Sequence, residues 1–113
     1  MKQLKWYFKN GTKYNTYSVL YEDDKFMLVR NDDHDEKEFN GKYGAYSFGT
    51  KDCFNSLYGS PVDWSCLHKE KAIEVLKGII GVEQQYLPTL GEIAEKNIIR
   101  WQGMINVLEK EIA

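Results

Sequence analysis

The chain of 113 residues contains few of the side chains that bind metals or act as nucleophiles and bases. Its two cysteines, Cys53 and Cys66, are too few for a disulfide framework, and its two histidines offer little choice of a general base. The pair Cys66 and His68 lacks the spacing of a structural zinc site. The acidic segment 31–42 lacks the glycine and the final glutamate of a calcium loop. We therefore expect no metal site, no cofactor and no catalytic centre.

The sequence also lacks a long apolar run. No stretch approaches the roughly 20 consecutive apolar residues that a membrane-spanning helix needs. Residues 1–9 are charged and aromatic, without the apolar region and small-residue cleavage site of a secretory signal. We therefore expect a cytoplasmic protein that does not associate with membranes.

Arginine is scarce, because Arg30 and Arg100 are the only arginines among the 15 basic residues. This usage, with abundant isoleucine, asparagine and tyrosine, indicates an AT-rich coding sequence, as in many low-GC bacteria and their phages. The formal net charge of −2 conceals a separation of charge. Residues 1–21 contain lysines and no acid, whereas residues 22–38 contain eight acids and three basic residues. Two interpretations remain open: complementary solvated edges of a sheet, or an acidic patch over 22–38 that docks on a basic partner.

The first half of the sequence has the period-two pattern of β-strands. An aromatic run over 4–9 is followed by Asn10-Gly11, the dipeptide most typical of a two-residue hairpin turn. Residues 13–21 then form the return strand, and strict alternation places Tyr21 on the same face as Tyr17 and Val19.

Further along, residues 26–30 are continuously apolar up to Arg30, which favours a central strand. Residues 43–50 form a fourth strand that two glycines weaken. Residues 51–67 show no clear period, and Gly59-Ser60-Pro61 within them indicates a loop.

The second half has the spacing of helices. We expect one helix over 69–80, with an extension over 82–87 that ends at Pro88. A second helix runs over 90–112, where apolar residues recur in steps of three and four. At its start, a capping box is predicted for Thr89 and Glu92. The short connection between the helices favours an antiparallel hairpin.

Strands followed by helices indicate a single α+β domain over residues 1–113. We expect an N-terminal antiparallel sheet of roughly three to five strands in a β-rich half, 1–67, because period-two segments of this kind pair in sequence. One face of the sheet packs against a two-helix hairpin within residues 68–113.

Aromatic residues make up 14% of the chain and cluster with glycines between residues 43 and 64. These rings are either the core beneath the sheet or a ligand site in which rings stack on a base, a contact worth roughly 1–3 kcal/mol. In the second case arginine meets phosphate, and Asn55 reads a polar edge of the ligand. The candidate ligand-binding residues are then Arg30, Tyr46, Phe54, Asn55, Trp64 and Arg100.

The last helix also carries a candidate contact surface. Ile99 lies off the main apolar stripe, beside Arg100 and Trp101, and is either a scattered surface residue or part of an interface. Because the two helices carry more apolar surface than one side of a small sheet can cover, we expect a homo-oligomer, most simply a symmetric dimer. The candidate interface residues are Ile99, Trp101, Met104 and Leu108.

In layout, with strands over 4–50, aromatic residues and Asn55 before the helices, and Arg100 on the last helix, the chain resembles a family of phage counter-defence proteins. These anti-Thoeris proteins sequester cyclic ADP-ribose signals and form symmetric oligomers. The resemblance implies a non-catalytic protein that captures a cyclic nucleotide or an ADP-ribose-derived signal in the host cytosol, without binding nucleic acid directly.

Two other function classes remain open. One is a protein inhibitor that docks its acidic 22–38 face on a basic partner such as a bacterial defence protein, as an anti-CRISPR protein that mimics nucleic acid would. The other is a structural or assembly protein held by its helical hairpin.

Overall fold

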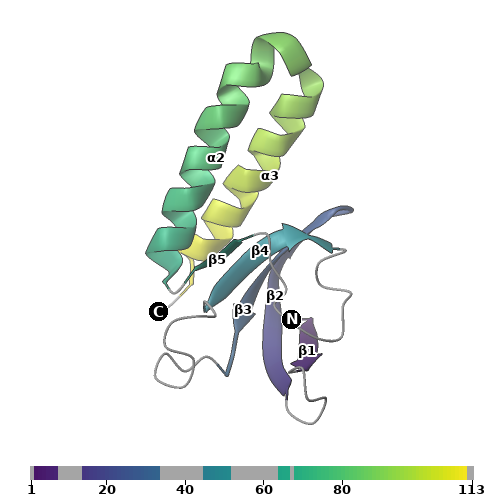
Figure 1. Cartoon of the computed structure of the whole chain (residues 1–113), viewed down its shortest axis with the longest axis vertical. Helices are drawn as coiled ribbons and strands as arrows, with labels where there is room; N and C mark the ends of the chain where they lie inside the picture. The colour runs from purple at the N-terminus through teal and green to yellow at the C-terminus, as the bar shows by residue number, and fades with distance from the viewer. Residues whose placement is uncertain (1, 8–13, 34–44, 52–63, 67, 112–113) are drawn as a thin grey trace.

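The computed structural model describes residues 2–7, 14–33, 45–51, 64–66 and 68–111. In these segments five strands precede two helices, and the predicted α+β class is confirmed (Figure 1). The elements are β1 (Gln3–Tyr7), β2 (Tyr14–Glu22), β3 (Phe26–Asn31), β4 (Tyr46–Thr50), β5 (Trp64–Cys66), α2 (Lys69–Leu90) and α3 (Glu92–Glu109).

The strands form one antiparallel sheet in the order β1-β2-β3-β4-β5, so each strand pairs with its neighbours in sequence. The central place predicted for residues 26–30 is confirmed by β3. The Asn10-Gly11 turn lies outside the described residues. Strand β5 was not predicted, because three residues are too few to show a period-two pattern.

A β-bulge in β2 corrects the predicted facing of Tyr21. Val19 pairs with Val29, but the next pair is Tyr21 with Leu28, so the register shifts between them. One extra residue in a strand turns the side chains that follow it to the other face of the sheet. Tyr21 therefore packs on the helix side, and the prediction that it shares a face with Tyr17 and Val19 is wrong.

The sheet is buried on both faces, which explains the continuous apolar run in β3. Leu28 and Val29, on opposite faces, are each 0% exposed. The core between sheet and helices, here called the helix-side core, contains Leu28, Tyr46, Phe48, Ala72, Leu76, Trp101, Met104, Ile105 and Leu108. The opposite face buries Tyr17, Val19, Met27 and Val29.

The boundary between the helices differs from the prediction. Helix α2 continues through Pro88 to Leu90. Pro88 has no backbone N–H and therefore removes one helical hydrogen bond. Because Pro88 lies in the exposed last turn of α2, the loss of this hydrogen bond costs little stability. Leu90 therefore ends α2 instead of beginning the next helix.

Gly91 makes the turn between the helices, with φ of 54°, and its N–H donates to the Leu87 carbonyl at 2.9 Å. This backbone conformation favours glycine because it has no Cβ. Gly91 is also the N-cap of α3, which has no side-chain capping hydrogen bond. The predicted capping box of Thr89 and Glu92 is therefore wrong.

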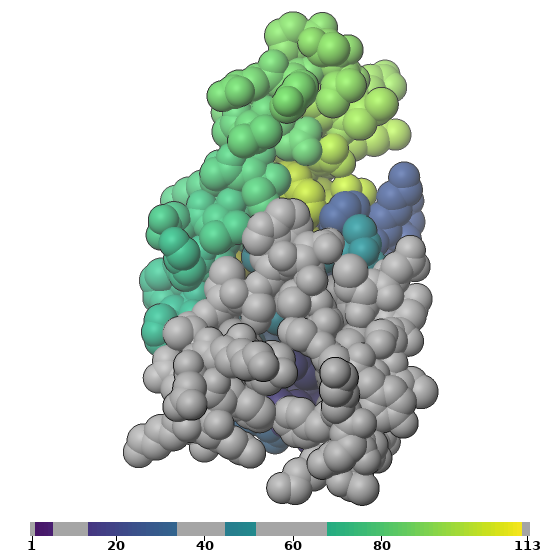
Figure 2. Space-filling model, in the orientation of Figure 1, coloured from purple at the N-terminus to yellow at the C-terminus, as the bar shows by residue number. Residues whose placement is uncertain are grey.

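The hairpin extends beyond the sheet, and Figure 2 shows its tip standing clear of the rest of the molecule. The molecule accordingly measures 48 × 26 × 25 Å. Of the seven large apolar side chains exposed among the described residues, six lie from Val82 to Ile99, in this projecting half. Of the helices in the described residues, neither combines the length and apolarity that a membrane crossing requires.

Burial also corrects the predicted oligomer interface. Trp101, Met104 and Leu108 lie in the helix-side core of a single chain, so they are not part of a surface. Ile99 is 64% exposed and is the one member of the predicted set that a partner can reach. The correction arises because the apolar stripe of α3 is covered by α2 and the sheet.

Candidate functional site

The candidate site forms where the turn between β2 and β3 meets α3, and Asp23 organises this turn. Its Oδ1 accepts hydrogen bonds from the backbone N–H groups of Lys25 and Phe26, both at 2.9 Å. Its Oδ2 accepts from Arg100 Nε at 2.6 Å and from the Tyr21 hydroxyl at 3.3 Å. One carboxylate therefore holds the shape of the turn and ties it to α3.

Arg100 is held in place on three sides. Besides its bond to Asp23, its Nη1 donates to Asn97 Oδ1 at 3.0 Å, and its guanidinium carbon lies 4.2 Å from the centre of the Phe26 ring. The Phe26 ring in turn meets the edge of Trp101, with ring centres 5.0 Å apart. The Arg100 side chain is only 13% exposed. Its orientation is therefore set before any ligand arrives.

The pKa values of the surrounding groups follow from this arrangement. Burial alone would raise the pKa of Asp23, but the hydrogen bonds from Arg100 and from two backbone N–H groups outweigh it and lower the pKa below its ordinary value. Burial, together with the nearby Asp23 charge, raises the pKa of Tyr21. Asp23 is thus an anion and Tyr21 a neutral donor around neutral pH.

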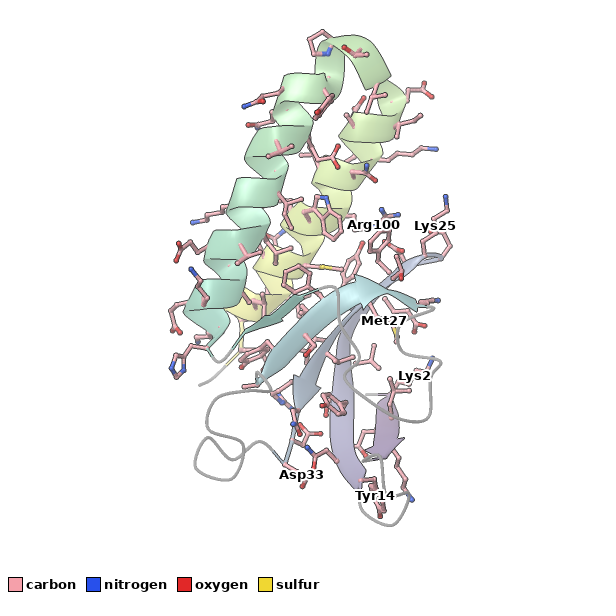
Figure 3. All side chains as sticks on the ribbon, viewed as in Figure 1. Lys2, Tyr14, Lys25, Met27, Asp33 and Arg100 are labelled. Carbon is pink, nitrogen blue, oxygen red and sulfur yellow. The ribbon has the colours of Figure 1, made fainter. Side chains whose placement is uncertain are left out.

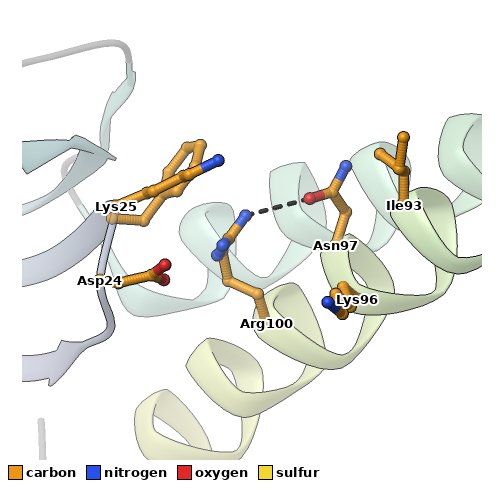
Figure 4. Close-up of a pocket in the computed structure, with 7 residues that line it drawn as sticks. Asp24, Lys25, Ile93, Lys96, Asn97 and Arg100 are labelled. Atoms are coloured by element: carbon orange, nitrogen blue, oxygen red, sulfur yellow. Dashed lines mark hydrogen bonds between the residues drawn. The ribbon is translucent and has the colours of Figure 1, made fainter.

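Beside this junction lies a groove of about 600 Å³. Its lining comes from the β2–β3 turn and from one face of α3 (Figure 4). The lining residues are Asp24, Lys25, Phe26, Ile93, Lys96, Asn97 and Arg100.

The groove is cationic although the protein is acidic. Three basic side chains and one acidic side chain line it, and Asp23 pairs with Arg100, so one net positive charge remains, whereas the whole chain has a formal charge of −2. Within the described part of the chain, Lys25 and Lys96 form no ion pair, and Arg100 keeps its Nη2 group without a hydrogen-bond partner. The arrangement can attract an anion and donate several hydrogen bonds to it.

Of the six residues predicted to bind a ligand, Arg100 lines the groove. Arg30 lies near the other end of β3, where its Nε donates to Asp32 at 2.9 Å and its Nη1 to Glu111 at 2.6 Å. The hydrogen bond from Arg30 to Asp32 and the Glu111 charge raise the pKa of Arg30. Arg30 therefore ties the end of the chain to the sheet, and the structure does not bring the two arginines together.

The predicted aromatic residues also lie away from the groove or outside the described residues. Tyr46 is 7% exposed and packs in the helix-side core, so its ring is a core ring, as the structural interpretation of the aromatic cluster had it. Phe54 and Asn55 lie outside the described residues. Trp64 begins β5 opposite Phe48, and only its backbone is described.

The sequence interpretation missed most of the groove. Ile93, Lys96 and Asn97 precede Arg100 by seven, four and three residues, a spacing that puts all four on one side of a helix. That signal was present in the sequence. Lys25 and Phe26 had no such signal, because their place beside α3 depends on how the sheet packs against the helices.

The separated charges of the sequence meet in the fold. Glu22 pairs with Lys2 at 3.3 Å and with Lys51 at 2.9 Å, and Asp23 pairs with Arg100. At the opposite end of β2 and β3, which Figure 3 marks by Asp33, the Asp33 carboxylate accepts the Thr16 N–H at 2.6 Å. Of these contacts, the pair of Lys2 and Glu22 joins the two charged segments, as the interpretation of complementary edges predicts.

Neither metal-binding side chains nor comparisons with known proteins assign a function to the groove. Within the described ranges, no three His, Cys, Asp or Glu side chains group closely enough to hold a metal ion. The chain matches no family model, no curated protein and no solved structure.

Proposed function

We propose that this protein is a non-catalytic binding protein that captures an anionic, nucleotide-like ligand in the groove between the β2–β3 turn and α3. One observation carries the proposal: Lys25 and Lys96, without ion-pair partners in the described residues, converge with Arg100 on a partly apolar hollow of about 600 Å³. That volume lies within the roughly 300–1,000 Å³ typical of small-molecule sites.

The chemistry of the groove suits a phosphate joined to an apolar or planar group. Arg100 and the two lysines offer charged donors, and Asn97 offers an amide. Phe26 and Ile93 supply the apolar part of the lining, and Ile93 is 61% exposed. Because Asp23 and Asn97 already hold Arg100, binding costs little side-chain ordering at that residue.

Capture without turnover is the form that the described lining supports best. It contains no serine, cysteine or histidine, the side chains that most often act as nucleophile or general base. In its most specific form, the proposal is a phage-type counter-defence protein that sequesters a cyclic nucleotide or an ADP-ribose-derived signal. The cationic groove and the layout resemblance both support this form.

The test is a thermal-shift screen against cyclic nucleotides and ADP-ribose derivatives, followed by calorimetry. A ligand that binds only the native state at a hundredfold excess over Kd stabilises it by about 2.7 kcal/mol. Lys96→Ala should weaken binding about tenfold, because it removes one charged contact. Lys77→Ala is the matched control, since Lys77 is an exposed lysine on α2 that does not line the groove.

Recovery of the bound compound distinguishes capture from catalysis. Denaturing the complex should release the ligand chemically intact, as mass spectrometry can show. Steady conversion of the ligand would make the protein an enzyme. Equal binding by the Lys96 and Lys77 variants would place the site elsewhere.

A further inference from the structure

A second hollow of about 470 Å³ adjoins the groove on its sheet side. Asp24, Lys25 and Phe26 line both hollows, and Thr50 and Lys51, at the end of β4, complete the second one. Both hollows are therefore bounded by the β2–β3 turn. Figure 3 shows Lys25 and Arg100 close together, where the sheet meets the helices.

The second hollow has its own cation in a defined position. The backbone N–H of Lys51 donates to the Lys25 carbonyl at 2.8 Å, which fixes the end of β4 beside the turn. Lys51 Nζ lies 2.9 Å from Glu22, and Lys2 Nζ lies 3.3 Å from the same carboxylate oxygen. Because two lysines share one carboxylate, this cluster keeps a net positive charge. The hydrogen bond from Lys51 helps to lower the pKa of Glu22, so the carboxylate stays ionised around neutral pH.

Cations thus line both hollows, with Lys96 and Arg100 in the first and Lys51 in the second. Lys25 and the apolar Phe26 ring line both hollows. A ligand with a single anionic group would leave the cations of one hollow unmatched.

We propose that the ligand spans both hollows and carries two anionic groups held apart by a sugar-sized spacer, as a nucleoside bisphosphate does. This inference rests on the proposed function and names the ligand class for that site. One anionic group meets Lys96 and Arg100, and the other meets Lys51. Lys25 contributes to both, because it lines both hollows.

The test compares two probes that differ by one phosphate, adenosine 5′-monophosphate and adenosine 3′,5′-bisphosphate, by calorimetry on the full chain. The bisphosphate should bind about tenfold more tightly, since one charged contact is added. Lys51→Ala should remove most of that advantage. Lys96→Ala should weaken both probes.

Lys51→Arg keeps the charge and should bind the bisphosphate within about twofold of the wild type, which separates loss of charge from loss of structure. Melting temperatures without ligand show that each variant is folded. Equal affinity for the two probes, or a Lys51→Ala variant that retains the bisphosphate advantage, overturns the two-anion inference alone. Binding of neither probe, when a cyclic nucleotide or an ADP-ribose derivative does bind, overturns the inference alone. Binding of none of these compounds overturns the proposed function as well.

Discussion

Replacing Gly103 with alanine tests whether the close approach of β2 to α3 depends on a glycine. A Cβ at this position would lie 2.9 Å from Cε2 of the Tyr21 ring, nearer than the roughly 3.5–4.0 Å at which carbon atoms pack best. The ring has little room to withdraw, because Tyr21 packs against the helix-side core and its hydroxyl donates to Asp23. We therefore expect overpacking to cost about 1–3 kcal/mol.

Helix propensity opposes part of that cost, because alanine is favoured over glycine in a helix by about 1 kcal/mol. The net effect expected for Gly103→Ala is a loss of about 0–2 kcal/mol in the free energy of unfolding. Gly78→Ala is the matched control, since a Cβ there meets no atom within 4 Å. It should stabilise the protein by about 0.5–1 kcal/mol, so the two identical substitutions should have opposite signs.

Urea unfolding followed by tryptophan fluorescence measures both effects on one scale. Repeating Gly103→Ala in a Tyr21→Ala background tests the contact, because the ring is then absent. The penalty should vanish in that background, and the difference between the two backgrounds is the coupling energy between the two sites. If Gly103→Ala stabilises the chain as Gly78→Ala does, the contact with the Tyr21 ring is not tight and the reasoning fails. A penalty that persists without the ring would point to another cause.

Three further predictions follow from the charged contacts and the hairpin. Asp23→Asn should destabilise the protein by about 1–3 kcal/mol, because it leaves the largely buried Arg100 side chain without its anion. Chemical denaturation measures this loss, and no loss would mean that the ion pair is dispensable. Because the folded-state pKa of Asp23 lies below its ordinary value, its stabilisation should be present above about pH 4 and be lost as the pH falls further. The stability gap between wild type and Asp23→Asn should therefore narrow in acid, and a pH-independent gap would contradict the assignment. The projecting hairpin should mediate self-association, because it exposes large apolar side chains such as Val82 and Tyr86. Light scattering should give a mass above 13.2 kDa for the wild type and the monomer mass for a Val82→Ser, Tyr86→Ser double variant. A monomeric wild type would refute this prediction.

Local patterns in the sequence were sufficient for most of the fold. The alternation in 13–21, the apolar run in 26–30 and the three-and-four spacing of 90–112 correspond to β2, β3 and α3. These signals work because they reflect burial on one or both sides of a single element. For the candidate site, both arginines were predicted to meet a phosphate because an arginine fork suits phosphate geometry. Arg100 lines the groove, whereas Arg30 forms an ion pair with Glu111.

The class of each long element and the order of strands before helices could be predicted from the sequence, since these depend on the period of neighbouring side chains. The bulge that turns Tyr21 toward α3, the three-residue strand β5 and the pairing of Asp23 with Arg100 became visible only in the folded molecule. The same holds for the place of Trp101 in the core and for the groove that Lys25 and Lys96 share. These features arise from contacts between residues far apart in the chain, such as Asp23 and Arg100. No local period records which of two distant elements will meet, because that is set by how the sheet and the hairpin pack together.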